Sequence, residues 1–590
     1  MPLELDGGED GDARALLTCL GTHGIVIDDT RLARLAEGLG HLRKLLAVSA
    51  PSEAGMPAER VGAATTLSAT PIQPAAHTVL PILSLSLSDA ASQIRSGQLS
   101  PVTLLEACLQ RIALLDDEIH AFTTLDIEGA RHAARRAADD IAKGLWRGPL
   151  HGVPISIKDV IDVAGLPTLA QSRHRRQAPL PATHAAAVSQ LVRAGAVLIG
   201  KTTTHEYAFG GPEWTLPAAA LQQQAHQEIS VASGASTASD AAHASASLSD
   251  AGRLPGPAAR NPWSTARFAG GSSSGAAASV ACGMALGALG SDTAGSIRSP
   301  AALCGMTGFK PGRHTIERSG CLPLTDSLDA MGVIAESAMD CALLFDALNA
   351  DPSTSLAANL SGALQGLKIG VIRHFFTDGL PISTAATQYI DAAIAVFEDA
   401  GAIVEAVDCA SLQAWNAVGM TILLAEAFAL YAPALRDHLD AFGDTFADAV
   451  LLGAALDADA YQRATAQRAA LTASMDALAK DYDLLVAPIQ AGEAPYLTDL
   501  SPWGFLQRPS YGIPFNLADM PALSLCCGFG PNGLPLALQL VCARGNEAQV
   551  LDAAHGFQMR TDWHLRHRQP PPYASTAASR SAPRSAPHSQ

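Results

Sequence analysis

The sequence predicts an α/β fold, in which helices cover a buried β-sheet and a small helical module precedes the main domain. Between residues 84 and 568, short apolar runs alternate with longer segments of helical period, which is typical of a buried sheet covered by helices. Hydrophobic residues make up 48% of the 590 residues and charged residues 16%, which is enough for a large core and argues against global disorder. Between residues 10 and 50, leucines and isoleucines recur every three or four positions, which predicts the helical module.

Changes in composition predict the domain boundaries. The helical module takes residues 1–50, and residues 51–83 form a linker rich in Ala, Pro and Ser. The main domain covers residues 84–568. Within it, residues 213–259 are mostly Ala, Ser, Gln, His and Asp, which predicts a surface insertion without a core of its own. Residues 569–590 are expected to be a disordered tail.

Local signals predict the individual elements of the first half. Caps and periodicity give a helix that begins near residues 28–30, a helix capped by Ser88 and Asp89, a helix opened by Ser100 and Pro101, a buried strand within 151–159, a helix at 187–194, a strand at 196–199 and a tightly packed buried helix at 275–290.

The second half alternates in the same way. We expect strands at 367–372, 403–407, 484–487, 523–527 and 536–541, and helices at 384–400, 414–435, 459–480 and 546–559.

Charge and cysteine content exclude several classes of function. The formal net charge is −17, so a nucleic-acid-binding surface is not expected. None of the ten cysteines forms a Cys-x-x-Cys pair, which indicates neither a zinc site nor a redox motif. The N-terminus lacks the pattern of a signal peptide, and the most apolar stretch, 275–290, is too short to span a membrane. We therefore expect a soluble cytoplasmic protein without cofactor or metal.

Two short motifs suggest functions that their context disfavours. Residues 195–202 (Gly-Ala-Val-Leu-Ile-Gly-Lys-Thr) match the phosphate-loop pattern, but the four middle residues predict a buried strand rather than a phosphate-binding loop. Residues 271–275 (Gly-Ser-Ser-Ser-Gly) match the nucleophile elbow of α/β-hydrolases, with Ser273 as nucleophile. An elbow needs a strand that runs directly into it, and residues 266–270 look like a poor strand.

Three other segments together suggest amide hydrolysis. They are Lys158 with Asp159 at the end of an apolar run, the Gly/Ser run at 270–275, and residues 290–298 (Gly-Ser-Asp-Thr-Ala-Gly-Ser-Ile-Arg). Cleavage of an amide needs an activated nucleophile, stabilisation of the oxyanion and a proton for the departing amine. A buried lysine can be the base if its pKa falls, and glycine-rich turns let backbone N–H groups converge on the oxyanion.

At these positions the chain resembles the amidase signature family, whose pattern fits residues 84–568. The matching segments are 151–154, 158–159, 270–275, 292–301, 304–311, 514–517 and 521–524. The resemblance implies an α/β/α sandwich with a large mixed central sheet. It also implies an amidohydrolase that acts through an acyl-enzyme.

The resemblance assigns roles by motif position. Ser296 would be the nucleophile, Ser272 the bridging serine with a cis peptide bond, and Lys158 the base. The oxyanion hole would be formed by the N–H groups of Thr293, Ala294, Gly295 and Ser296. Supporting contacts would come from Ser273, Asp292 and Arg298.

The chain departs from the family pattern in three places. Ala294 stands where glycine is usual, and its Cβ disfavours a positive φ. The insertion at 213–259 is longer than usual. The module at 10–50 weakly resembles the small subunit that accompanies some carboxybiuret hydrolases, here fused ahead of the main domain.

The leading hypothesis is therefore an amidase that hydrolyses a small carboxamide, or a carbamate- or anilide-like amide, to an acid and ammonia or an amine. The alternatives are an amidotransferase subunit that needs partners and a silent binding protein of the same fold. A homodimer is the default expectation, and a small amide is the expected partner, with neither nucleic acid nor membrane.

Pocket residues are harder to place from sequence. His205 followed by Glu206 suggests a metal site, but no second ligand stands at zinc spacing, so His205 is expected to pack near the pocket. Aromatic candidates for the pocket wall are Tyr207, Trp214, Phe428, Trp503, Phe505 and Tyr511.

Overall fold

The computed structural model describes residues 8–47, 84–212, 256–349, 355–377 and 382–568. In this part of the chain, eleven strands form one mixed sheet in the order β1-β3-β2-β6-β8-β7-β12-β13-β11-β9-β10. Their bounds are β1 Phe122–Leu125, β2 Pro154–Lys158, β3 Val197–Thr202, β6 Gly287–Asp292, β7 Thr307–Lys310, β8 Ala330–Ala335, β9 Lys368–Ile372, β10 Ile403–Val407, β11 Leu484–Pro488, β12 Ala522–Phe529 and β13 Pro535–Val541. The predicted α/β class with a large mixed sheet is confirmed.

Parallel strands lie toward both ends of the sheet and antiparallel strands lie at its centre. The β3-β2-β6 and β11-β9-β10 groups are parallel, whereas β8, β7, β12 and β13 pair antiparallel with their neighbours. Because β2 and β6 are parallel neighbours, their carboxyl ends meet at the same edge of the sheet. Lys158 and Asp292 end these two strands, so two of the predicted site residues come together there.

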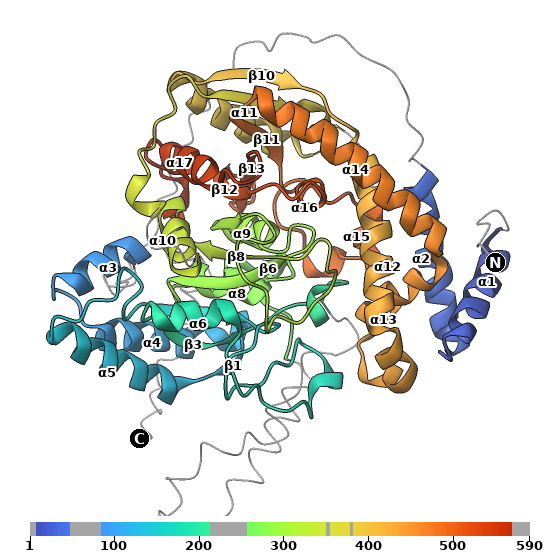
Figure 1. Ribbon diagram of the computed structural model, residues 1–590, viewed down its shortest axis with the longest axis horizontal. Helices are drawn as coiled ribbons and strands as arrows, with labels where there is room; N and C mark the ends of the chain where they lie inside the picture. Colours follow the sequence, from blue (N-terminus) through green and yellow to red (C-terminus); the bar gives the residue numbers. More distant parts are fainter. Residues whose placement is uncertain (1–7, 48–83, 213–255, 350–354, 378–381, 569–590) are drawn as a thin grey trace, which may run out of the picture.

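Helices enclose the sheet (Figure 1). Their bounds are α3 Leu87–Arg95, α4 Pro101–Ile119, α5 Ile127–Ala142, α6 Ala186–Arg193, α8 Ser274–Ala281, α9 Arg298–Cys304, α10 Ala338–Leu348, α11 Thr384–Asp399, α12 Leu412–His438, α13 Asp444–Leu451, α14 Ala458–Asp481, α15 Gly504–Gln507, α16 Ile513–Leu517 and α17 Glu547–Gln558. Helices α8 and α9 pack against each other and against the central strands. The Gly/Ser run at 270–275 leads into α8, and the loop after β6 leads into α9.

Helix starts follow the polar residues in front of them. Ser100 caps α4 by accepting a hydrogen bond from the N–H of Val102, with Pro101 at the first helical position, as predicted. The cap of α3 differs from the prediction, because Ser86 rather than Ser88 accepts from the N–H of Asp89. The carboxylate of Asp89 accepts in return from the N–H of Ser86, which completes a capping box.

The stretch 275–290 is not the single buried helix that we predicted. Helix α8 ends at Ala281, the chain turns at Gly283 with φ +65°, and β6 begins at Gly287. Both halves are buried on every side, so neither shows an amphipathic period that would separate helix from strand.

The helical module packs onto the main domain. It consists of α1 (Gly8–Thr22) and α2 (Asp29–Ala47), and the buried leucines of α2 join the main core. Arg31 and Arg34 of α2 form ion pairs with Asp444 and Asp448 of α13, at N–O distances of 2.5–3.3 Å. Figure 1 shows α2 beside α12 and α13. The predicted linker (51–83) and tail (569–590) lie outside the described residues, as does nearly all of the insertion (213–255).

Helix α12 is the one described helix whose length and composition would suit a membrane span. In the structure, 67% of its apolar window is buried inside the protein, where it packs against α13, α14 and α16. Its apolar residues thus belong to the core.

Candidate active site

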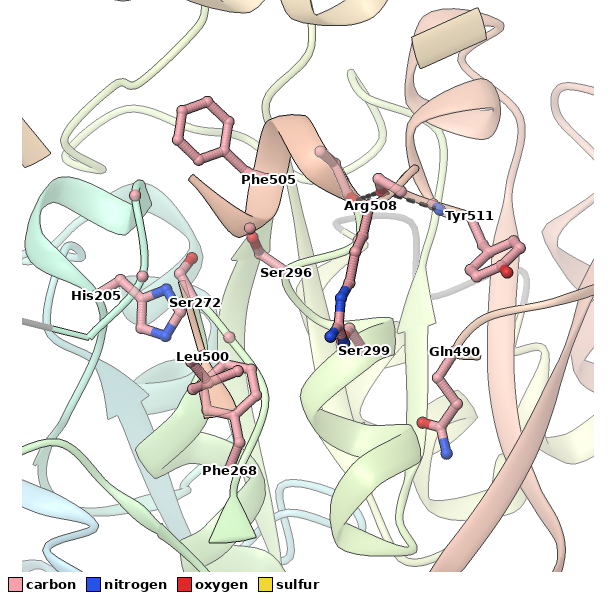
Figure 2. Close-up of a pocket in the computed structure, with 18 of the residues that line it drawn as sticks. His205, Phe268, Ser272, Ser296, Ser299, Gln490, Leu500, Phe505, Arg508 and Tyr511 are labelled. Atoms are coloured by element: carbon pink, nitrogen blue, oxygen red, sulfur yellow. Dashed lines mark hydrogen bonds between the residues drawn. The ribbon is translucent and has the colours of Figure 1, made fainter. Parts of the chain in front are cut away.

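A cavity of about 420 Å³ opens at the carboxyl edge of β2 and β6. Four segments supply most of its wall: 205–212, the turn at 271–272, the loop 293–299 after β6, and the segment 489–512. Single residues complete it: Phe268, Leu303, Leu324, Met420 and Leu423. Figure 2 shows Ser272 and Ser296 facing each other across part of this cavity. Ser272 and Ser296, 24 positions apart in sequence, thus share one solvent-accessible space.

Lys158 lies beneath this cavity at the end of β2, and its side chain is fully buried. Its Nζ donates to Ser272 Oγ at 2.8 Å, to Ser291 Oγ at 2.9 Å and to the carbonyl oxygen of Ser291 at 3.2 Å. Burial lowers the pKa of Lys158 to about 7, and the more distant acids Asp292 and Asp329 offset this only in part. Lys158 can therefore be neutral near physiological pH, as a general base must be.

Ser272 follows Gly271, a position that has no room for a side chain. The Gly271–Ser272 peptide bond is cis, as the resemblance implied. A Cβ on Gly271 would lie 2.0 Å from Cε1 of His205. The ring of His205 stacks on Phe268 and lines the cavity, which confirms its expected place near the pocket. Burial lowers the pKa of His205 to about 3, so this ring is neutral beside Lys158.

Ser296 stands in the loop that connects β6 to α9. Asp292 holds this loop by accepting from the N–H groups of Gly295 at 2.7 Å and of Ile297 at 3.0 Å. Gly295 has φ +114°, so the left-handed residue of the loop is a glycine and Ala294 keeps an ordinary backbone. Within the described residues, the hydroxyl of Ser296 makes no hydrogen bond, and it is open to the cavity.

The N–H groups of this loop differ in availability. That of Gly295 is engaged by Asp292 and is not free for a substrate oxyanion, unlike our prediction. Those of Thr293, Ala294 and Ser296 have no partner in the described part of the chain. The difference arises because the carboxylate of Asp292 turns back under the loop, which the residue spacing alone does not reveal.

Arg298 and Asp292 form a buried ion pair behind the loop. Arg298 donates to both carboxylate oxygens, from Nη2 at 3.0 Å and from Nε at 3.1 Å, and also bonds Gln539 and Asn516. Burial alone would raise the pKa of Asp292, but Arg298 outweighs it and holds this pKa well below its usual range. Both residues thus hold the loop from behind, and their role in supporting a catalytic site stays a prediction.

Ser273 supports the site without facing the cavity. Its side chain is fully buried. Its hydroxyl donates to the carbonyl oxygen of Ser291 at 3.2 Å, and its N–H donates to the carbonyl oxygen of Ser296 at 3.1 Å. A strand does precede the Gly/Ser run, contrary to our prediction: β5 (Ser264–Phe268). It pairs with the short β4 (Arg260–Asn261) and bridges to Tyr496 through Arg267, outside the main sheet, and a buried Ser273 cannot be an exposed elbow nucleophile.

The phosphate-loop pattern at 195–202 belongs to a strand, as expected. Residues 197–202 form strand β3 rather than a phosphate-binding loop. Lys201 is fully buried and forms an ion pair with Asp159 at 2.8 Å.

The predicted aromatic residues divide into two groups. Phe505 and Tyr511 line the cavity, whereas Tyr207 and Trp503 pack elsewhere and Phe428 lines a second cavity near His23. Trp214 lies outside the described residues.

Several residues of the site were missed in the sequence. They are Ser291, which holds Lys158, and the cavity residues Phe209, Phe268, Ser299, Gln490 and Arg508. Ser291 left a usable signal, a polar residue inside a buried strand next to the motif. No pattern marks Gln490 or Arg508, because segment 489–512 reaches the cavity only through the fold. Among the described residues, no cluster of three or more His, Cys, Asp or Glu side chains could hold a metal ion.

Comparisons with known proteins show which family and fold the chain resembles. A family model described as Amidase matches residues 103–213 and 237–551. A glutamyl-tRNA(Gln) amidotransferase subunit from Roseiflexus sp. (strain RS-1) is 34% identical over 522 residues, which cover 82% of this chain and 97% of that relative. Among solved structures, a protein from a vestigial complex linked to the origins of an s-triazine catabolic enzyme matches with a TM-score of 0.69 and 29% identity, covering 81% of this chain and 98% of that one. The peptide amidase of Stenotrophomonas maltophilia matches with a TM-score of 0.66 and 27% identity, covering 83% and 99%.

The fold and these relatives define an enzyme of the class that acts on amide carbon–nitrogen bonds. The family model covers well over half of the residues, and the chain belongs to the amidase, or amidase signature, family.

Proposed function

We propose that this protein is a serine amidase in which Ser296 attacks the amide carbonyl, Ser272 relays the proton and Lys158 is the base. The observation that carries the proposal is the 2.8 Å contact between Lys158 Nζ and Ser272 Oγ, at the wall of the cavity that exposes Ser296. A lysine with a pKa of about 7 can take a proton from a serine that in turn accepts one from the nucleophile.

The reaction would proceed in two balanced halves. Ser296 Oγ bonds to the carbonyl carbon while its proton passes to Ser272 and the proton of Ser272 passes to Lys158. The charged lysine then returns a proton through Ser272 to the amide nitrogen, the carbon–nitrogen bond breaks, and an ester on Ser296 remains. Water repeats the sequence on this ester and releases the carboxylic acid.

The negative charge that develops on the carbonyl oxygen needs fixed donors. The N–H groups of Thr293, Ala294 and Ser296 are the candidates, because they are unpaired in the described chain and belong to the nucleophile's loop. Each such donor typically contributes about 10²- to 10³-fold in kcat. The ion pair of Arg298 with Asp292 keeps the loop in place before substrate arrives.

The substrate is proposed to be a small carboxamide, or a carbamate- or anilide-like amide. A volume of about 420 Å³ holds a molecule of modest size, and Phe209, Phe268 and Phe505 give part of its wall an apolar character. The proposal includes a cytoplasmic location. A homodimer stays a prediction.

Trapping of the acyl-enzyme tests this function. Wild type, Ser296→Ala and Ser273→Ala are incubated with a serine-reactive phosphonate, and the intact mass is measured. Labelling that is lost only in Ser296→Ala supports the proposal. Labelling lost only in Ser273→Ala, or no labelling of wild type at all, contradicts it.

A second candidate function is that of an amidotransferase subunit. It is favoured by the 34% identity to a protein named for that role in Roseiflexus. Its mark would be ammonia release from glutamine only when partner subunits are added, whereas a self-sufficient amidase releases ammonia from a simple carboxamide without them.

A further inference from the structure

Arg508 is a cation of the substrate cavity that has no counter-ion among the described residues. It lies in segment 489–512, is exposed and lines the cavity. Figure 2 shows its side chain directed into the cavity, in this view toward Ser299, which lines the same cavity. Within the described residues, that guanidinium makes neither a hydrogen bond nor an ion pair.

The other titratable residues of the cavity wall do not neutralise this charge. The carboxylate of Glu493 is occupied by three donors, the N–H and Nδ2 of Asn532 and the N–H of Leu534, at 2.6–3.0 Å. Asp499 lies on the same wall, exposed, and accepts a long hydrogen bond from Thr498 at 3.4 Å. His205 is neutral, as described above. Arg508 is therefore left to bind an anion that enters the cavity.

Two further polar groups of the wall are unused. The hydroxyl of Ser299 has no partner among the described residues. Gln490 is only 7% exposed, and its Oε1 is buried without a hydrogen-bond partner, while its Nε2 donates to the carbonyl oxygen of Pro535 at 3.2 Å. A buried acceptor left open at a cavity wall costs free energy until a ligand fills it.

The position of Ser299 fixes the distance from the nucleophile. Its N–H donates to the carbonyl oxygen of Gly295 at 2.8 Å, so residues 295–299 close one turn of helical type where the loop enters α9. Residues three apart on a helix have Cβ atoms about 5–6 Å apart. An anion held by Arg508 beside Ser299 would therefore lie only a few atoms from the carbonyl that Ser296 attacks.

We propose that the substrate is an amide that carries a carboxylate close to the scissile carbonyl, bound by Arg508 and Ser299. A planar guanidinium suits a carboxylate because it can donate two parallel hydrogen bonds. The inference rests on the proposed function for the identity of the scissile bond, but the binding of the anion stands apart from the chemistry. Arg508 is in this scheme a specificity-determining residue.

Binding of a matched pair of amides to the full chain tests the proposal. Succinamate carries a carboxylate where the similar-sized succinamide carries a neutral amide. Their dissociation constants are measured by calorimetry in the Ser296→Ala protein, which cannot turn them over. We expect succinamate to bind about 10- to 100-fold more tightly, the usual effect of a hydrogen bond to a charged group. Equal affinities, or no binding of either, would overturn the proposal.

Three further variants in the Ser296→Ala protein assign the effect to one residue. Arg508→Gln should bring the two affinities together, and Arg508→Lys should keep part of the preference. Arg463→Gln is the matched control, an exposed arginine of α14 outside the cavity, and should leave the preference intact. A preference that survives in Arg508→Gln contradicts the proposal.

Phosphonate labelling of the wild type separates this test from that of the proposed function. Labelling at Ser296 without a preference for succinamate leaves the amidase proposal standing and removes this one. A preference for succinamate without labelling of Ser296 leaves the carboxylate-binding proposal standing and removes the amidase proposal.

Discussion

Lys158 Nζ lies 2.8 Å from Ser272 Oγ and 2.9 Å from Ser291 Oγ, fully buried beneath the cavity. The lysine is thus oriented by two serine hydroxyls, one from the turn at 271–272 and one from β6. A buried lysine in this setting is able to lose its proton near neutral pH, and the first predictions concern that proton.

Activity should rise with pH through the pKa of Lys158. The base is neutral above about 7, so kcat/KM toward a carboxamide should increase about tenfold per unit below this value and level off above it. A pH–rate profile between about pH 5.5 and about pH 9 measures this rise in kcat/KM. Lys158→Arg should lose about 10²- to 10⁴-fold at every pH, because a guanidinium does not deprotonate. A profile that is flat across 6–8 contradicts the assignment of the base.

The same shift makes a prediction about stability. The pKa of Lys158 is about 7 in the folded state, below the 10.5 of an ordinary lysine, so between these values the unfolded state binds more protons. Stability should therefore rise with pH in this window. Wild type should gain free energy of unfolding relative to Lys158→Met between pH 7 and pH 9, measured by denaturant titration. A constant difference would indicate that the lysine is charged when folded.

Ser291 should matter for turnover more than for substrate binding. Ser291→Ala removes one of the acceptors that orient Lys158, and the loss of one hydrogen bond should lower kcat by up to about tenfold with little change in KM. Steady-state kinetics gives both constants. Ser279→Ala is the control, since this buried serine of α8 contacts Ser156 and lies outside the cavity. A change confined to KM would speak against a positioning role.

Asp292 should be essential to the stability of the nucleophile's loop. Asp292→Asn leaves the buried guanidinium of Arg298 without its counter-ion, which should cost about 3–5 kcal/mol of the free energy of unfolding, together with most activity. Asp437→Asn breaks the exposed pair with Arg436 and should leave both quantities unchanged. Chemical denaturation followed by circular dichroism compares the free energies of unfolding of the two variants. Equal stability of the two variants would exclude the supporting role.

The helical module should influence the cavity through α2. A Cβ on Gly38 would lie 2.6 Å from the indole of Trp503, which packs outside the cavity but contacts Phe505, two residues further along the wall segment 489–512. The ring of His41 also contacts Gln507 at 3.0 Å. Gly38→Ala should therefore cost about 1–3 kcal/mol of stability and raise KM.

Gly40 provides the matched control on the same helix. Nothing lies within 4 Å of a Cβ at this position, so Gly40→Ala should be neutral or stabilising by about 0.5–1 kcal/mol, with KM unchanged. Thermal unfolding and steady-state kinetics measure both variants. Identical behaviour of the two alanines would show that α2 does not brace the wall.

The sequence by itself determined the α/β class and the two N-terminal helices, and it pointed to the segments that line the cavity. Periodicity sufficed for amphipathic elements such as α4 and for β3, where Ala-Val-Leu-Ile excludes a phosphate loop. It failed at 275–290, because a helix and a strand that are buried on all sides both appear as continuous apolar sequence.

Only the tertiary structure decided how these segments act together. The parallel pairing of β2 with β6 brings Lys158 to Ser291, and the inward turn of Asp292 takes the N–H of Gly295 away from the cavity. Arg508 and Gln490 line the same cavity as Ser296 from about 200 residues further along the chain. Such contacts depend on the packing of distant segments, which leaves no local pattern, whereas caps and hydrophobic periods arise from neighbours in sequence and can be read there.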